Sequence, residues 1–391
     1  MHTTDKGRSD VIKYFIAIAC LGLGASMVDS SFNNFLRSTW DITGLARSAL
    51  ELPREIPGFL NVFVAAILAF LPGRRIGALS ILLQAIGITL LGNLSTTFQS
   101  MTGFLFIYSL GQHLFMPIQQ ATGMELAKAG GEGALLGKAN AVRNLAQLAG
   151  GAIVILGFSK LGFTFRLNFI LTAVVFLAAA IAMGTMTSPP HDRKAKKLVL
   201  KKRYGLFYLL SVLFGTRKQL FITFAPWVVV SVYGKDVSTV ASLYFAGGLA
   251  GVIFQPLLGK AVDKLGERFI LGLEAITLIP VCLLYGFSRF ILPEGIAFAV
   301  VCVCYVIDSL LLNFGMARST WLKKIAEKPE DIAPTLAMGI SIDHIFSIGV
   351  ALASGLLWDR FGYQWVFLVG AFIAAANWVA TRWVRVRTAV S

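Results

Sequence analysis

Twelve apolar segments, each long enough to cross a lipid bilayer as a helix, occupy most of this 391-residue chain. A bilayer-spanning helix needs about 20 mostly apolar residues. Only 14% of the residues are charged, whereas soluble domains carry about 25%. We therefore predict an all-α membrane protein with twelve transmembrane helices. The segments are 11–35, 50–71, 76–95, 101–126, 135–158, 165–187, 205–232, 239–259, 268–288, 293–317, 334–357 and 363–384.

Two similar stretches lie about 200 residues apart in the chain. Gly157–Phe165 reads GFSKLGFTF and Leu357–Trp365 reads LWDRFGYQW, so that Gly162 and Gly362 align. Each stretch is flanked on both sides by apolar segments. Internal duplication within an apolar chain is typical of transporters.

The longest polar segment separates the sixth apolar segment from the seventh. It spans residues 188–203 and is rich in Lys and Arg. We predict two pseudo-symmetric six-helix bundles, 1–187 and 204–391, joined by this basic linker.

The distribution of positive charge predicts the orientation in the membrane. With the N-terminus placed inside, the segments on that side hold 24 of the 35 Lys and Arg residues. Positive residues favour the cytoplasmic side, so both termini are expected there, in a cell membrane (the inner membrane if the chain is bacterial). We assign the net charge of +15 to orientation and contact with anionic lipids, and expect no nucleic-acid partner.

One loop carries a recognisable motif. Gly259–Arg268 reads GKAVDKLGER, with Gly259, Asp263 and Arg268 at its key positions. This pattern at a helix turn resembles the signature loop of the major facilitator superfamily, and the Asp359–Tyr363 turn is similar to that family's usual connection. The resemblance implies transport by rocking of two halves, with Asp263 and Arg268 in a gating latch.

The matching loop of the first half departs from that pattern. Leu71–Gly77 reads LPGRRIG, which keeps a basic pair but has no aspartate. This departure puts an ordinary first-half latch in doubt.

Charged residues inside the apolar segments are the candidate functional residues. A charge at mid-bilayer costs at least about 2.5–3.5 kcal/mol, so it usually faces a cavity or a partner. The resemblance implies a central cavity lined chiefly by helices 1, 4, 7 and 10. The expected substrate-binding residues are Asn33, Arg54, His113, Arg217, Lys218 and Asn313. The expected proton-coupling residues are Asp29, Glu55, Asp308, Asp343 and His344.

Several of these residues have a structural alternative. Arg217 could form a salt bridge with Asp308 or Asp29 instead of binding a substrate. Arg143 and Asp343 occupy matching positions in the two halves with opposite charges. They could bridge the halves, which is why Arg143 is assigned a gating role, or each could serve its own half.

The chain has no metalloprotease, nucleotide-binding or nucleophile motif. We therefore expect no enzymatic activity, no catalytic residue, no cofactor and no structural metal. The mixture of buried acids and bases favours a secondary active transporter, a monomer that moves a small polar, anionic solute with protons. Sodium coupling stays open, because Asp and Asn clusters could coordinate that ion. The alternatives are a proton-driven exporter of drugs or lipophilic metabolites, and a transport-inactive receptor or scaffold.

Overall fold

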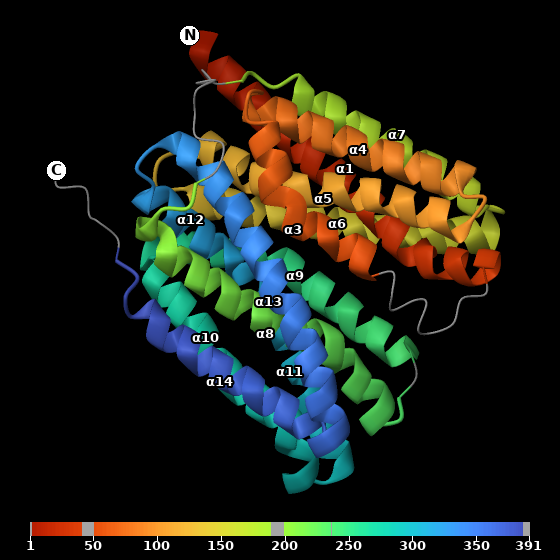
Figure 1. Cartoon of the computed structure of the whole chain (residues 1–391), viewed down its shortest axis with the longest axis vertical. Coiled ribbons are helices and arrows are strands. Elements are labelled where there is room, and N and C mark those ends of the chain that lie inside the picture. Colours follow the sequence, from red (N-terminus) through yellow and green to blue (C-terminus); the bar gives the residue numbers. More distant parts are fainter. Residues whose placement is uncertain (1, 41–50, 189–198, 236, 386–391) are drawn as a thin grey trace. The chain divides into compact units, whose positions relative to one another are not determined.

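The structure is a computed structural model that describes residues 2–40, 51–188, 199–235 and 237–385 (Figure 1). Within these ranges the chain is helical almost throughout and contains no β-strand. The helices form two compact units, which are described separately. Unit 1 comprises 1–128, 138–199 and 330–341, and unit 2 comprises 129–137, 200–329 and 342–391.

Unit 1 is built from the helices of the first half. In this unit α4 packs against both α5 and α7, α1 packs against α7, and α3 packs against α5. These helices are α1 (His2–Trp40), α3 (Glu51–Ile67), α4 (Gly73–Leu94), α5 (Phe98–Leu126), most of α6 (Glu132–Lys160) and α7 (Phe165–Gly184).

Unit 2 is built from the helices of the second half. Here α10 packs against both α11 and α14, α8 packs against α14, and α9 packs against α11. The helices are α8 (Gly205–Trp227), α9 (Val237–Leu265), α10 (Glu267–Ile291), α11 (Glu294–Leu311), α12 (Gly315–Ile325), most of α13 (Ile332–Phe361) and α14 (Tyr363–Thr381). Short helical turns extend α8 through Val232 and join α11 to α12.

The packing of unit 2 repeats that of unit 1. A shift of 200 residues places α4 on α10, α7 on α14, α5 on α11, α1 on α8 and α3 on α9. Under that correspondence the four helix pairs of unit 1 are the same four pairs as in unit 2. The predicted pseudo-symmetric, all-α architecture is confirmed.

The repeated glycines explain why the duplication is visible in the sequence. Gly162 lies in the α6–α7 connection with a φ of 65°, and Gly362 lies in the α13–α14 connection with a φ of 97°. A side chain at these backbone angles costs free energy, so glycine is favoured. The matching turns therefore need the same residue in both halves.

Each of the twelve predicted segments coincides with a helix, within a few residues at most ends. Within the described ranges, eight helices are long and apolar enough to cross a membrane, judged by length and composition. The largest differences are at the start of the first segment, where α1 begins at His2, and at the end of the segment predicted at 293–317. In the 293–317 segment the helical path continues through α12 to Ile325, and Met316–Leu322 are all buried.

Two helices are divided between the units. The first turns of α6, up to Gly137, belong to unit 2, while the first part of α13, from Ile332 to Ser341, belongs to unit 1. The predicted boundaries at 187 and 204 stay a prediction. Residues 189–198 of the predicted linker lie outside the described residues.

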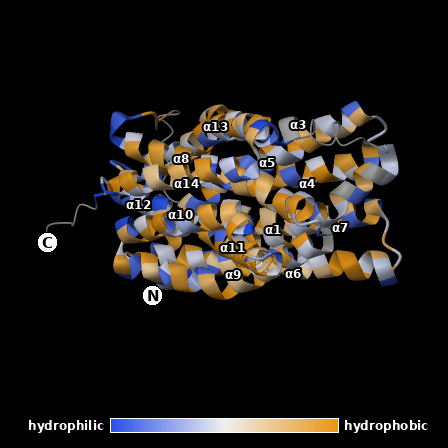
Figure 2. Cartoon of the chain, turned by 90° about the horizontal axis from the view of Figure 1, so that it is seen from below, coloured by the Kyte–Doolittle hydropathy of each residue, from blue (hydrophilic) through white to orange (hydrophobic). Residues whose placement is uncertain are grey.

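Large apolar side chains remain exposed along the helices, and the helices carry many apolar residues, coloured orange in Figure 2. Ile155, Ile253 and Phe372 are 68%, 69% and 68% exposed. Water-soluble proteins rarely leave extended apolar surface uncovered. These faces suit contact with lipid, so the chain is a multi-pass membrane protein.

Candidate functional site

In unit 1, three predicted residues form one electrostatic cluster. The carboxylate of Asp29 on α1 interacts with the guanidinium groups of Arg54 on α3 and Arg143 on α6. Asp29 is exposed, and the two arginines are partly buried. An acid on one helix therefore faces bases from two others. The Asn33 side chain lies outside the described residues.

Arg143 also has a neutral partner. Its Nη1 donates to the side-chain oxygen of Gln119 on α5 at 3.4 Å. The hydroxyl of Tyr14 on α1 donates to the backbone oxygen of Gln119 at 3.0 Å. Gln119 thus connects α1, α5 and α6 around the arginine.

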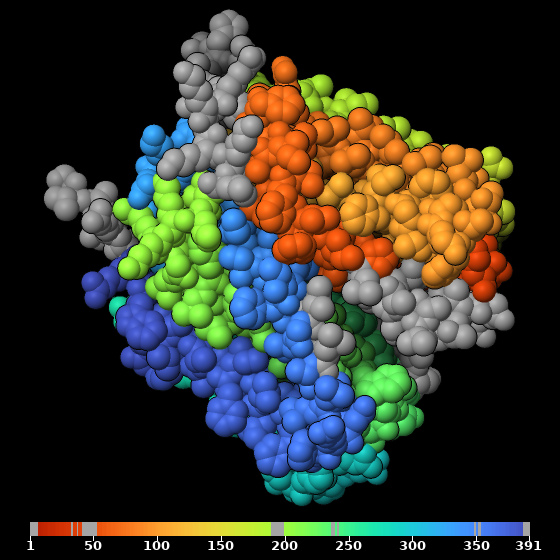
Figure 3. Space-filling view, viewed as in Figure 1, coloured from red at the N-terminus to blue at the C-terminus, as the bar shows by residue number. Residues whose placement is uncertain are grey.

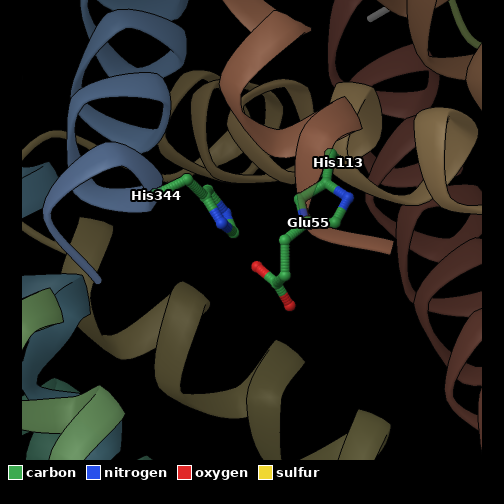
Figure 4. A group of neighbouring side chains, drawn as sticks. All are labelled: Glu55, His113 and His344. Atoms are coloured by element: carbon green, nitrogen blue, oxygen red, sulfur yellow. The ribbon is translucent and has the colours of Figure 1, made fainter. Parts of the chain in front are cut away.

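Glu55 and His113 lie close together in unit 1 (Figure 4). A carboxylate oxygen of Glu55 and a ring nitrogen of His113 are within 4.8 Å. The Ser109 hydroxyl donates to the backbone oxygen of Arg54 at 2.5 Å. His113 Nδ1 lies 2.9 Å from the backbone oxygen of Ser109, which can only accept a hydrogen bond. Nδ1 therefore carries the hydrogen, and Nε2 is the nitrogen that can take up a proton.

In unit 2, Arg217 on α8 forms a buried ion pair with Asp308 on α11. Its Nη2 also lies 3.8 Å from Glu274 Oε1 on α10. Arg217 is 1% exposed, Glu274 0% and Asp308 5%. One cation thus faces two carboxylates, and burying this group is tolerable only because opposite charges are in contact.

Arg318 supplies the second cation of this buried group. It lies on α12, is 8% exposed, and its guanidinium stacks over the Phe214 ring at 3.6 Å from the ring centre. It interacts electrostatically with Glu274 and Asp343. Two arginines therefore balance the Glu274 and Asp308 carboxylates.

Lys218 and Asp343 form a second ion pair beside this group. Lys218 Nζ lies 3.2 Å from Asp343 Oδ2, and the two side chains are 27% and 14% exposed. The Ser347 hydroxyl, one turn further along α13, donates to Asp343 Oδ1 at 3.1 Å. Adjacent residues of α8 thus take different partners, with Arg217 buried and Lys218 partly accessible.

The other predicted polar residues of unit 2 are placed as follows. His344, also labelled in Figure 4, is 9% exposed. The Asn313 amide donates to the backbone oxygens of Ser309 and Leu310 at 3.3 and 3.2 Å, so it bonds its own helix. The alternative that Arg217 pairs with Asp308 is the one observed.

Asp263 of the signature loop binds backbone groups. Its two carboxylate oxygens accept hydrogen bonds from Gly133 N at 2.8 Å and Ala134 N at 2.7 Å. These amides lie in the first turn of α6, where backbone N–H groups have no partner within the helix and carry partial positive charge. Asp263 therefore caps α6.

Two ion pairs surround this cap. Glu132 Oε1 lies 2.6 Å from Lys323 Nζ, and Glu267 Oε1 lies 2.7 Å from Lys324 Nζ. Arg268, in contrast, is exposed and pairs with no acid among the described residues. Asp263 alone accepts the hydrogen bonds of the cap, and the two lysines pair with neighbouring acids.

The first-half loop uses its basic pair differently. Arg74 is buried, with Nη1 3.0 Å from Asp10 Oδ2 and Nη2 2.7 Å from Glu125 Oε1. Asp10 also accepts from Thr187 N at 3.1 Å. The acids come from the start of α1 and the end of α5, so the loop itself needs no aspartate.

Sequence reasoning missed Glu274 and Arg318. Glu274 was detectable, since it is an acid in the middle of the apolar segment 268–288. Arg318 was not, because it follows directly after the expected end of its helix at residue 317, where a basic residue is usual on the cytoplasmic side. Only the continuation of the helix into α12 shows that it is buried.

Comparison with known proteins places this architecture. The solved structure of a proton:xylose symporter, XylE, aligns with a TM-score of 0.78 at 13% identity, over 98% of this chain and 97% of that one. The transporter FucP in its outward conformation gives 0.73 at 12% identity, over 97% and 98%. The human organic anion transporter MFSD10 gives 0.68 at 11% identity, over 96% and 99%. At these identities the likeness establishes the fold alone.

A search of curated proteins with the sequence found no match. The model of the Major Facilitator Superfamily, however, matches residues 14–342. That range covers the greater part of the chain, from α1 into α13. The chain belongs to the major facilitator superfamily.

Proposed function

We propose that this protein is a secondary active transporter that moves a small polar, anionic organic solute across a cell membrane, coupled to protons. The chain forms two bundles with cytoplasmic termini, and alternating access of a central site carries the solute. Members of this superfamily are transporters rather than enzymes, which agrees with the absence of enzyme motifs from the sequence.

The observation that carries the proposal is the partly accessible Lys218–Asp343 pair. Its side chains are 27% and 14% exposed, whereas Arg217 and Asp308 are nearly inaccessible. Protonation of Asp343 would remove the charge that holds Lys218. Lys218 would then be able to bind an anionic group of the solute, and loss of the proton would favour release.

The electrostatic surroundings support this exchange. Asp343 is contacted by Lys218 and Ser347 and interacts with Arg318. Arg217, Lys218 and Arg318 balance Glu274, Asp308 and Asp343, so taking up one proton leaves one positive charge in excess. An anion is the ligand that this excess charge would attract.

In unit 1, Asp29, Arg54, Glu55, His113 and Arg143 offer a second set of polar groups. We propose that Arg54 and His113 bind polar groups of the solute, that Asp29 and Glu55 take up protons, and that Arg143 serves in gating. Two structural neighbours are described as proton symporters of xylose and of fucose, and a third as an organic anion transporter. Neutral sugars are therefore the first competitors to test against organic anions.

The test has two stages. A thermal-shift screen of the purified full chain with carboxylates, sugars, amino acids and lipophilic amphiphiles identifies the solute class. Uptake into proteoliposomes under an inward proton gradient then measures transport. Anion accumulation that collapses with a protonophore supports the proposal. Accumulation that depends on a sodium gradient instead would identify sodium, not the proton, as the coupling ion.

Two variants test the role of the pair. Asp343→Asn is expected to abolish gradient-driven accumulation while solute counterflow persists, and Asp359→Asn, which changes an exposed acid on the same helix, should transport normally. Unchanged proton dependence in Asp343→Asn would contradict the coupling role. Accumulation of lipophilic compounds alone would favour the exporter, and binding without any transport would favour the receptor.

A further inference from the structure

A groove on the outer surface of unit 2 lies between α10 and α14, outside the charge network. Its volume is about 520 Å³. The two helices are packed side by side (Figure 1), and α14, in dark blue, lies at the surface in Figure 3. The lining residues are Leu265, Arg268, Phe269, Gly272, Leu273, Ile276, Trp378, Thr381 and Arg382.

The groove exists because α10 has a glycine where it faces α14. Arg268, Gly272 and Ile276 are spaced four residues apart, so they lie on one face of α10. A Cβ at Gly272 would have only Thr381 Oγ1 nearby, at 3.6 Å. The missing side chain leaves a hollow between the arginine at one end and the isoleucine at the other.

One end of the groove is positively charged. Arg268 and Arg382 are both exposed, and within the described part of the chain neither forms an ion pair. The neighbouring Glu267 is 1% exposed and engaged with Lys324. An anion at this end would therefore meet two cations and no competing acid.

The rest of the groove is apolar. Phe269, Leu273 and Ile276 are 55%, 42% and 47% exposed. Trp378 lies on the α14 side, with the Arg382 guanidinium stacked over its ring at 4.2 Å from the centre. Tryptophan and arginine together are typical of the boundary between headgroups and hydrocarbon.

We propose that this groove binds an anionic glycerophospholipid. The phosphate lies between Arg268 and Arg382, and an acyl chain follows Phe269, Leu273 and Ile276 past Trp378. Basic pockets between membrane helices are known to suit such headgroups. The positive charge at one end of the groove favours an anionic lipid over a zwitterionic one. The apolar side chains along the rest of the groove favour a ligand with an acyl chain over a small soluble phosphate.

Fluorescence quenching by lipids with brominated acyl chains tests the site on the full chain in detergent. Brominated phosphatidylglycerol is expected to quench a component that disappears in Trp378→Phe. Each basic side chain near a lipid surface contributes about 1 kcal/mol, so phosphatidylglycerol should bind roughly 10- to 30-fold more tightly than phosphatidylcholine. Equal quenching by the two lipids would overturn the proposal.

Variants separate charge from shape. Arg268→Gln/Arg382→Gln should reduce phosphatidylglycerol affinity to the level of phosphatidylcholine. Arg75→Gln/Lys128→Gln removes the same charge from exposed residues elsewhere and should leave the preference intact. Gly272→Leu fills the groove without changing its charge. It should weaken the binding of both phosphatidylglycerol and phosphatidylcholine.

Two outcomes would contradict the proposal. The first is an equal loss of preference in the Arg75/Lys128 control, which would mean a general effect of net charge. The second is displacement of the lipid by millimolar inorganic phosphate, which would indicate an anion site without lipid specificity. Gel filtration and the melting temperature of each variant verify that it is folded.

Discussion

The ammonium group of Lys218 lies 3.2 Å from the carboxylate of Asp343, and this contact joins α8 to α13 within unit 2. Next to it along α8, Arg217 is buried against Asp308 and Glu274. Two adjacent cations on one helix therefore differ sharply in accessibility. We expect their substitutions to differ as sharply in the loss of stability that they cause.

Lys218→Met and Asp343→Asn should each destabilise the protein, because each leaves a partly buried charge without its partner. The expected loss is about 1–3 kcal/mol for each single variant, and less than the sum for the double variant. The measurement is a double-mutant cycle on thermal unfolding in detergent. Lys264→Met with Asp359→Asn, two exposed groups with no mutual contact, is the matched control, and fully additive losses at Lys218 and Asp343 would disprove the coupling.

Arg217→Met should destabilise the folded protein more than Lys218→Met does. It would leave Asp308 and Glu274 buried and facing each other without their shared cation, a change that costs about 3–5 kcal/mol. We expect a sharp fall in the yield of monodisperse protein by gel filtration, partly restored in Arg217→Met/Asp308→Asn. Equal yields for the Arg217 and Lys218 variants would show that the burial of each cation does not determine how much its loss destabilises the protein.

Asp263→Ala should expose the first turn of α6. Hydrogen bonds from Gly133 N and Ala134 N to a carboxylate contribute about 1.5–3 kcal/mol each, so amide exchange at these two residues should accelerate about tenfold or more. Hydrogen–deuterium exchange with peptide-level mass spectrometry measures this directly. Lys264→Ala, one position along the chain and exposed, should leave the exchange unchanged.

Gly259→Ala should weaken the same region for a steric reason. A Cβ at Gly259 would collide with the backbone oxygen of Gly133, and backbone atoms cannot move aside cheaply. We expect a melting temperature several degrees below that of Gly295→Ala, whose Cβ would meet no atom within 4 Å. Similar melting temperatures for the two variants would mean that α6 can shift without cost.

Much of the fold could be predicted because bilayer-length apolar segments are visible directly in the sequence. The turn glycines Gly162 and Gly362 also indicate the duplication from the sequence alone. The limits of α12 could not be predicted in this way, because a charged residue such as Arg318 usually marks the end of a membrane-spanning helix. Its burial depends on Phe214 and Glu274, which lie far away in the sequence.

The pairing of charges was harder to predict than their presence. The insertion cost identified Arg217, Lys218, Asp308 and Asp343, but not which acid meets which base. Adjacent residues on a helix point about 100° apart, so the partners depend on how α10, α11 and α13 surround α8. The same applies to Arg74, whose acids come from helices remote in the sequence.

The assignment of the first turns of α6 to unit 2, and of the beginning of α13 to unit 1, has a consequence for how the chain can be divided. A cut in the central polar segment would give two fragments, each lacking a piece of its own unit: residues 330–341 for the first and 129–137 for the second. Neither fragment would contain a complete set of packing partners. Co-expressed fragments would therefore have to complement one another, and each would be expected to mature poorly when produced alone.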